Sequence, residues 1–259
     1  MDEPPGAPRP HRGSKPEHRL YLVRAAGIRA TGYRGGGCDI YTPLAVDASL
    51  RRVLTEAVGT DSVLQGGSVL APASAEDVAA VLRIAQGRRL PLRLTSGAGE
   101  AGTAPDGGAV LSLARLVALS VDASNGVVRA EAGATLTALA AALADAGLAV
   151  PGLSAARGSE RVGGLIARGG VSRRSLTGIE AVLPGGDLVQ FGGAVLKDVV
   201  GYDIASLLLG SRGRLAAILA VHLRLVPAGV AVEVAEPRGG RDVGDVVGVF
   251  DPEGILVAT

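Results

Sequence analysis

The stretch Gly192–Pro227 constrains the fold of this chain most, because it joins a loop, a short helix and a long apolar strand without interruption. Asp203 is placed to cap the helix, since its short carboxylate accepts hydrogen bonds from the otherwise unpaired N–H groups of the first turn. Gly210 follows where a left-handed residue ends such a helix, and Gly213 leads into the strand, which begins near Leu215. The stretch therefore predicts a loop–helix–strand unit.

Side chains alternate along the strand of this unit. An apolar set faces one side, while His222 and Arg224 face the other. The pattern predicts one face in the core and one face at least partly exposed to water. We interpret His222 as a structural or surface residue rather than a catalytic base, because it lies within a strand. The apolar set consists of Leu219, Val221, Leu223 and Leu225.

Residues 68–102 have the pattern of a strand, a helix, a second strand and a glycine-rich loop. Ser74 is placed to cap the helix, the second strand is Pro91–Thr95, and the loop is Ser96–Gly102. In a parallel βαβ unit such a loop emerges at the carboxyl end of its strand, where open α/β sheets place ligands. The loop glycines favour backbone N–H groups that converge on an anion; the alternative is an ordinary surface turn.

The rest of the chain predicts further helices and hairpins. Asp47 is placed to cap a helix over Leu50–Val58, and Thr135 is placed to cap a helix that Gly147 ends. Asn125–Gly126 is typical of a two-residue hairpin turn, and a second hairpin turns at residues 184–187.

A second glycine-rich segment spans residues 157–170. Val162–Gly164 is its turn, where small residues permit a ligand to approach the backbone. This part of the chain is also the most basic of the folded region. Its arginines hold a diphosphate, meet an acidic partner or form a solvated face, and the sequence leaves these three interpretations open. They are Arg157, Arg161, Arg168, Arg173 and Arg174.

Composition excludes several classes of protein. Lys and Arg number 26 against 25 Asp and Glu, so no global field points to nucleic acid. A single cysteine, Cys38, excludes an intramolecular disulfide and an all-cysteine zinc or iron–sulfur site. Residues 1–19 are rich in Pro and basic residues and predict a disordered arm. Without a long apolar run or a signal-peptide pattern, we expect a cytoplasmic protein.

Three segments resemble the FAD-binding (PCMH-type) domain of the vanillyl-alcohol oxidase superfamily: Lys197–Asp203, Leu208–Ser211 and Leu215–Pro227. The likeness is closest to the FAD-binding subunits of bacterial glycolate oxidase. It implies an α+β fold of two lobes, a small βαβ lobe and a larger lobe of mixed or antiparallel sheet with helices. The domain then covers residues 47–227, with residues 228–259 as a short linker and tail.

The resemblance also implies which residues bind the cofactor. No histidine occurs in either glycine-rich loop, so the FAD is expected to be non-covalent. Both the first loop and the segment between Gly170 and Ile179 are shorter than in the family, and the link Gly213–Ala216 departs from its pattern. Catalytic residues remain unassigned. The implied cofactor-binding residues are Ser96, Gly97, Ala98, Gly99, Gly102, Ser154, Val162, Gly163, Gly164, Ala167, Lys197 and Ile218.

The tail Phe250–Leu256 resembles the FDPxGIL ending that follows the cap domain in this family. We therefore expect a domain without its cap, in which another chain completes the substrate side. Analogy with glycolate oxidase implies a second flavin subunit or an iron–sulfur subunit as partner, a 2-hydroxy-acid type of substrate, and contact with a membrane only through partners. The alternatives are a cofactor-free scaffold subunit and a flavin-dependent reductase of the cell-wall precursor type.

One physical expectation underlies the flavoprotein hypothesis. Unpaired backbone amides at Gly97–Gly102 and around Gly163 are expected to face one another across a cleft that accommodates a dinucleotide. The redox chemistry itself then belongs to the cofactor.

Overall fold

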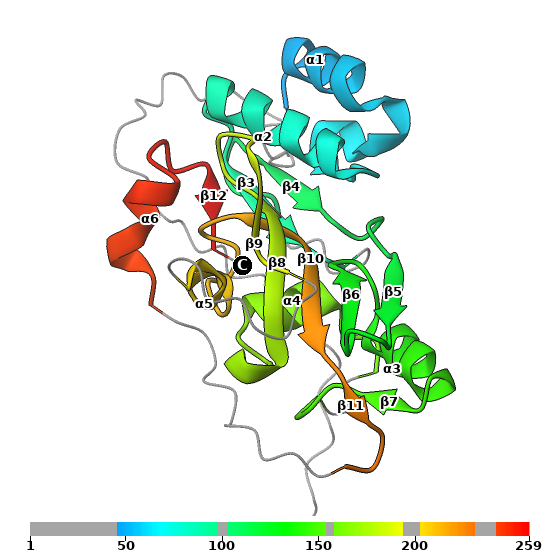
Figure 1. Ribbon diagram of the computed structural model, residues 1–259. Helices are drawn as coiled ribbons and strands as arrows, with labels where there is room; N and C mark the ends of the chain where they lie inside the picture. The colour runs from blue at the N-terminus through cyan, green and yellow to red at the C-terminus, as the bar shows by residue number, and fades with distance from the viewer. Residues whose placement is uncertain (1–45, 98–102, 154–157, 194–202, 231–241, 259) are drawn as a thin grey trace, which may run out of the picture. The chain divides into compact units, whose positions relative to one another are not determined.

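The computed structural model describes residues 46–97, 103–153, 158–193, 203–230 and 242–258, all within the compact unit Tyr41–Thr259. These residues form two five-stranded sheets and one two-stranded sheet, with helices packed against them (Figure 1). The predicted mixture of a parallel βαβ part and an antiparallel part is therefore present. No helix among these residues has the length and apolar character needed to cross a bilayer.

The first sheet is mainly parallel and has the strand order β1-β2-β4-β3-β12. Only β1 runs antiparallel to its neighbour, β2. Helices α1 (Ala48–Val58) and α2 (Ala75–Arg88) pack against each other and contribute to its core. We call these elements the first lobe. Its strands are β1 (Val63–Leu64), β2 (Val69–Leu70), β3 (Leu92–Thr95), β4 (Ala109–Ser112) and β12 (Leu256–Val257).

The predicted helix caps of the first lobe are confirmed. The Asp47 carboxylate accepts a hydrogen bond from the N–H of Leu50 at 2.8 Å, and the Ser74 hydroxyl accepts one from Asp77 at 3.1 Å. Helix α2 ends at Arg88, and Arg89 takes the left-handed conformation with φ of 51°. Both helices therefore begin where the sequence places an N–H acceptor.

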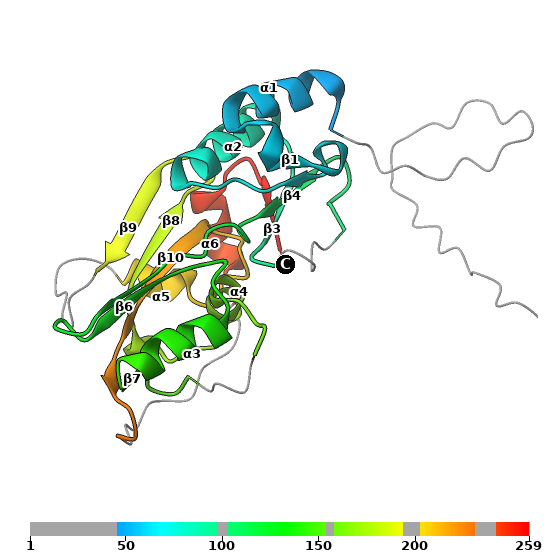
Figure 2. The ribbon, with the colours of Figure 1, turned by 90° about the vertical axis from the view of Figure 1, so that its right-hand side faces the viewer.

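The second sheet is antiparallel and has the strand order β5-β6-β10-β8-β9. Helices α3 (Leu136–Asp145), α4 (Val162–Ala167) and α5 (Ile204–Leu208) lie on one side of it and bury a single apolar cluster with it (Figure 2). We call these elements the second lobe. The strands are β5 (Leu119–Asp122), β6 (Val127–Glu131), β8 (Leu176–Val182), β9 (Leu188–Gly192) and β10 (Ala217–Arg224).

The helix caps and the hairpin turn predicted for the second lobe are also confirmed. The Thr135 hydroxyl accepts a hydrogen bond from the N–H of Ala138 at 3.1 Å, and the Asp203 carboxylate accepts one from Ser206 at 3.1 Å. Gly126 has φ of 63° in the turn between β5 and β6, as the Asn–Gly pair predicts. Strands β7 (Leu148–Ala149) and β11 (Val226–Pro227) form a small two-stranded sheet. In the sequence, β7 follows α3 and β11 follows β10.

The prediction that one face of the last long strand is exposed to water is wrong. All residues of β10 from 217 to 223 are buried, His222 included, and only Arg224 is exposed. The pairing of β10 with β8 shifts register between Ile218 and Ala220, which interrupts the simple alternation. Leu219 consequently belongs to the core of the first lobe, whereas Val221 belongs to the core of the second. The strand is central and is covered on both faces.

The C-terminal residues complete the first sheet. After helix α6 (Gly244–Phe250), the buried Asp251 carboxylate accepts hydrogen bonds from the N–H groups of Ile255 at 3.0 Å and Leu256 at 2.7 Å. This turn directs β12 alongside β3, with Leu256 paired to Leu92. The segment that the sequence set apart as a tail therefore supplies an edge strand of the first lobe.

Close backbone contacts join the two lobes. A Cβ atom on Gly133 would lie 2.6 Å from the carbonyl oxygen of Leu113 and 2.7 Å from that of Leu116, so only glycine fits where the chain leaves β6. Second-lobe residues Ala132, Val182, Ala217 and Leu219 pack into the core of the first lobe. The junction between the lobes is thus a packed interface around the ends of β6 and β10.

Candidate functional site

The two glycine-rich segments meet at this junction. Ser96 directly follows β3 of the first lobe, and Gly164 lies in α4 of the second lobe. The Gly164 N–H donates a hydrogen bond to Ser96 Oγ at 3.0 Å. The expectation that the two segments lie together is confirmed at this contact.

The expectation of unpaired amides in the second segment is wrong. The Val162 N–H donates to the Ala134 carbonyl at 2.9 Å, and the Gly163 N–H donates to the Ala132 carbonyl at 2.9 Å. In the first segment, the Gly97 N–H donates to Thr95 Oγ1 at 3.1 Å. These amides therefore complete hydrogen bonds within the protein rather than being left open for a ligand. The other amides of the first loop lie outside the described residues.

Glycine serves close packing in the second segment. A Cβ atom on Gly163 would lie 2.8 Å from the Cβ of Ala132 and 3.1 Å from its carbonyl oxygen. A Cβ atom on Gly164 would lie 3.2 Å from Ser96 Oγ and 3.3 Å from Nη1 of Arg168. The absent side chains therefore let α4 approach β6, and let a hydroxyl and a guanidinium group lie against the same glycine.

The remaining predicted residues fall into two groups. Ala167 and Ile218 are described: the Ala167 carbonyl accepts a hydrogen bond from the Arg212 N–H at 2.9 Å, and Ile218 is buried in β10 opposite Ala181. Five predicted residues lie outside the described part of the chain, namely Ala98, Gly99, Gly102, Ser154 and Lys197.

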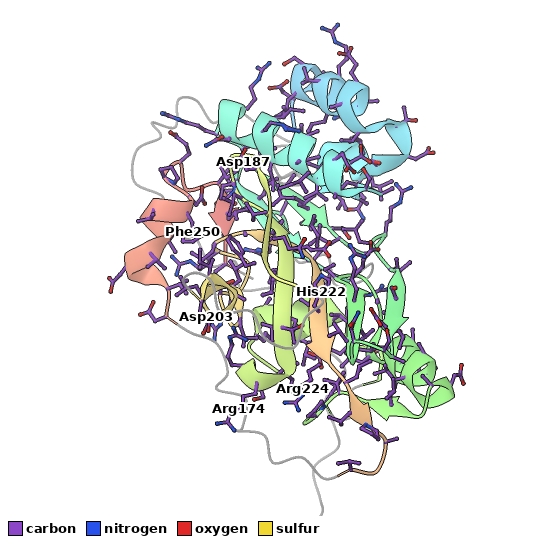
Figure 3. All side chains as sticks on the ribbon, in the orientation of Figure 1. Arg174, Asp187, Asp203, His222, Arg224 and Phe250 are labelled. Atoms are coloured by element: carbon purple, nitrogen blue, oxygen red, sulfur yellow. The ribbon has the colours of Figure 1, made fainter. Side chains whose placement is uncertain are left out.

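The predicted arginines have different environments. Arg168 forms an ion pair with Glu160, and Arg161 donates to the Gly133 carbonyl, so both lie at the junction. Arg173 instead holds the capping carboxylate of α5 with Nη2 2.6 Å from an Asp203 oxygen. Arg174 is exposed at the far end of the second lobe (Figure 3). Arg157 lies outside the described residues.

A charged network that the sequence did not predict crosses the second sheet. Arg129 Nε and Nη2 donate to the two carboxylate oxygens of Glu180 at 2.7 Å and 2.6 Å. His222, labelled in Figure 3, lies with its Nε2 2.8 Å from Glu180 Oε1. Arg129 Nη1 also lies 3.3 Å from Glu131. The residues come from β6, β8 and β10, and the only sequence signal was their alternation with the apolar positions of those strands.

Electrostatics within this network favour the ionised carboxylate. The Arg129 guanidinium holds the pKa of Glu180 below its ordinary value, burial opposes that shift, and His222 supports it. His222 is 6% exposed, and its buried Nδ1 has no hydrogen-bond partner among the residues that the structure describes. The bidentate pair of Arg129 with Glu180 satisfies its own charges, which points to a structural role for that pair.

The junction has the donors that an anionic ligand requires. Arg168 provides a guanidinium group and Ser96 provides a hydroxyl, and both lie beside Gly164, which has no side chain. Among the described residues, no group of three or more His, Cys, Asp or Glu side chains is arranged to hold a metal ion. The residues at the junction therefore fit an oxyanion, such as the diphosphate of a dinucleotide.

Comparison with known proteins assigns the class. Residues 67–195 match the sequence model of the family described as FAD binding domain, a range that contains both Ser96 and Gly164. These residues match the FAD-binding family model, and the chain is homologous to FAD-linked oxidoreductases.

Three relatives show the range of that homology. The chain is 38% identical over 168 residues to an uncharacterized FAD-linked oxidoreductase of Mycobacterium tuberculosis, a match that covers 60% of this chain and 37% of the relative. It is 35% identical over 175 residues to D-lactate dehydrogenase of Archaeoglobus fulgidus, covering 61% and 38%. It is 31% identical over 174 residues to glycolate oxidase subunit GlcD of Bacillus subtilis, covering 62% and 37%. The chain thus matches less than two fifths of the length of each relative.

Solved structures support the fold. 4-Ethylphenol oxidase from Gulosibacter chungangensis superposes with a TM-score of 0.53 at 20% identity, covering 70% of this chain and 42% of the oxidase. p-Cresol methylhydroxylase superposes with a TM-score of 0.54 at 14% identity, covering 69% and 43%. At such low identity the likeness concerns the fold alone.

Proposed function

We propose that this chain is the FAD-binding part of an FAD-linked oxidoreductase, with the dinucleotide held non-covalently between its two lobes. The observation that carries the proposal is the hydrogen bond from Gly164 to Ser96, because it joins the two glycine-rich segments within the matched residues 67–195. In open α/β sheets the carboxyl end of a parallel strand is the usual place for a nucleotide, and Ser96 directly follows β3 there.

The described residues have binding and orienting roles in this proposal. Ser96 and Arg168 hold the diphosphate, and Gly163 and Gly164 keep the two lobes close enough to span it. When bound, FAD supplies the transfer of a hydride or of electrons. The Arg129–Glu180–His222 network maintains the pairing of β6, β8 and β10, and takes no chemical part.

The substrate is proposed to be a 2-hydroxy acid. Support comes from relatives that are named as D-lactate dehydrogenase, D-2-hydroxyglutarate dehydrogenase and glycolate oxidase subunit. We further propose that another chain, a second flavin subunit or an iron–sulfur subunit, completes the substrate side and exchanges electrons with this one. The protein is then cytoplasmic, and any association with a membrane is through such partners.

A cofactor-free scaffold is the second candidate, and one observation favours it. The amides of Val162, Gly163 and Gly164 are all occupied by hydrogen bonds within the protein. A segment whose donors are already used stabilises the lobe junction without any ligand, as a docking subunit would require.

The absorbance spectrum of the purified full chain, with and without added FAD, separates the two candidates. The flavoprotein proposal predicts a perturbed flavin spectrum and a melting temperature that rises with FAD concentration, because a ligand that binds only the folded state stabilises it. Adenosine is the matched control, since it lacks the flavin and the diphosphate. An unchanged spectrum together with an unchanged melting temperature supports the scaffold.

A further inference from the structure

The C-terminal residues 242–258 contact the cores of both lobes, and we call this segment the latch. Val243, which precedes α6, is buried in the core of the second lobe. Ile255 and Leu256 are buried in the core of the first lobe. In Figure 1 the latch is the red end of the chain, with β12 beside β3. The segment is therefore attached to a different lobe near each of its ends.

Asp251 connects these two attachments. Its N–H donates to the Val247 carbonyl in α6 at 2.7 Å, and its carboxylate accepts from the N–H groups of Ile255 at 3.0 Å and Leu256 at 2.7 Å. The residue is 2% exposed, so the two amides replace the water that an exposed carboxylate would bind. Asp251 therefore couples the position of α6 to that of β12.

The latch is held by few contacts compared with the sheets. No residue of α6 is buried, and Val246, Val247 and Phe250 are only partly buried against the second-lobe core. Strand β12 pairs two residues with β3, whereas β10 pairs five residues with β6. Segments with little burial and few strand pairs open locally at a lower free energy than the whole fold. We expect the latch to open before the lobes unfold.

Opening of the latch affects the lobe junction through β3. Strand β12 is the outer neighbour of β3, with Leu256 paired to Leu92. The end of β3 directly precedes Ser96, whose hydroxyl accepts the hydrogen bond from Gly164 of the second lobe. Release of β12 removes the support at the outer edge of the strand that leads to this contact. A change in the latch therefore reaches the junction without altering the residues that meet there.

We propose that the latch opens by local unfolding and controls how fast a ligand enters and leaves the lobe junction. The inference rests on the proposed function for the identity of that ligand, FAD, and adds a conformational step to it. Closing segments of this kind often set the rates of ligand exchange in enzymes. Both entry and exit need the open state, so a weaker latch raises both rates. Loss of a ligand contact instead acts mainly on release.

Hydrogen–deuterium exchange of the full chain without FAD, resolved by residue with NMR, tests whether the latch opens on its own. The amides of Ile255 and Leu256 are expected to exchange at least about tenfold faster than those of β10, in the centre of the second sheet. Asp251→Ala removes their acceptor and is expected to raise their exchange about a further tenfold. Exchange of these two amides as slow as that of β10 would overturn the latch.

Stopped-flow flavin fluorescence on the full chain measures the entry and exit of FAD. Asp251→Ala is expected to raise both the association rate and the release rate, the latter about tenfold, because a charged hydrogen bond is lost. Asp251→Asn keeps one of the two acceptor oxygens and is expected to be intermediate; it also serves if the alanine variant folds poorly.

Two controls separate latch opening from other effects. Leu139→Ala weakens the second-lobe core from α3, outside the latch, and is expected to change neither rate. Glu253→Gln removes an exposed charge that pairs with Arg89 beside Asp251, and is likewise expected to change neither.

The outcomes distinguish the latch from the proposed function. Equal FAD rates in wild type and both Asp251 variants would overturn the latch and leave the proposed function intact, as would an equal increase in Leu139→Ala. Faster release with an unchanged association rate would also overturn the latch. Failure of the wild type to bind FAD would overturn the proposed function, and the exchange measurement would then test the opening of the latch without FAD.

Discussion

The lobe junction and the charged face of the second sheet each contain an arginine, a glutamate and a further polar side chain. The hydrogen bonds between these side chains differ in the two places. On the sheet, Arg129 binds both oxygens of Glu180 and also contacts Glu131, so the charges satisfy one another. At the junction, Arg168 uses one nitrogen for Glu160 and keeps another beside Ser96.

This difference separates structural from ligand-binding polar groups. A network that satisfies itself contributes to the stability of the fold, whereas a group with a remaining donor near solvent can bind a ligand. The comparison leads to a clear expectation: changes on the sheet alter stability and leave flavin affinity alone, and polar changes at the junction do the reverse.

The largest effect on stability is expected where the backbone of the junction is packed. Gly163→Ala places a methyl group 2.8 Å from the Cβ of Ala132, and overpacking of this kind lowers the free energy of unfolding by about 2–3 kcal/mol. Gly87→Ala is the control, because no atom lies within 4 Å of its Cβ position in α2, and alanine there adds about 0.5–1 kcal/mol. Urea unfolding of both variants measures the difference. Equal stability of the two would contradict the packing.

The sheet network is expected to have the next largest effect. Glu180→Gln removes the charge that pairs with Arg129 and His222, and lowers the free energy of unfolding by about 1–2 kcal/mol, since the pair is only partly buried. Glu56→Gln, in an exposed ion pair with Arg52, changes it by less than about 0.5 kcal/mol. Flavin affinity is unchanged in both. Weakened FAD binding in Glu180→Gln would break the comparison.

The Glu180 carboxylate also makes the free energy of unfolding depend on pH in the acid range. The folded-state pKa of Glu180 is lowered from 4.5 chiefly by Arg129, so its contribution is complete above the unfolded value and is lost as pH falls through the folded value. The stability difference between wild type and Glu180→Gln should therefore shrink as the pH falls below about 4.5. Unfolding curves recorded across the acid range measure it, and a difference that grows on acidification would show the opposite sign of shift.

The smallest effect on stability is expected for Ser96→Ala. Loss of its single hydrogen bond with Gly164 lowers the free energy of unfolding by about 1 kcal/mol or less. Ser124→Ala, which removes an exposed hydroxyl bonded to Asp122, serves as the control for an ordinary surface hydroxyl. The two variants should be similar in stability and differ in FAD affinity. Similar FAD affinity in the two variants would contradict a role of the Ser96 hydroxyl in binding FAD.

Local chemistry in the sequence predicted much of the fold. Asp47, Ser74, Thr135 and Asp203 cap the helices as expected, because a cap depends on residues only three positions apart. The position of β12 beside β3 was not predicted, because that pairing joins residues far apart in the chain. Likewise, the register shift in β10 depends on its neighbour β8, and no local pattern reveals it.

The candidate site was predicted in location but not in chemistry. Two glycine-rich segments pointed to Ser96 and Gly164, and the structure brings them into contact. The glycines of the second segment suggested free amides, yet Gly163 is glycine because Ala132 packs against it. Sequence alone does not distinguish a glycine that keeps a backbone amide accessible from a glycine that permits close packing, since the residue is the same in both cases.

Hydrogen–deuterium exchange of the full chain, with and without saturating FAD, tests the central claim most directly. The claim predicts slower exchange on binding in peptides that cover residues 92–97 and 160–168, with unchanged exchange in β5 and β9 at the edges of the second sheet. Bound FAD that protects the sheet edges and leaves both junction segments unchanged would contradict it.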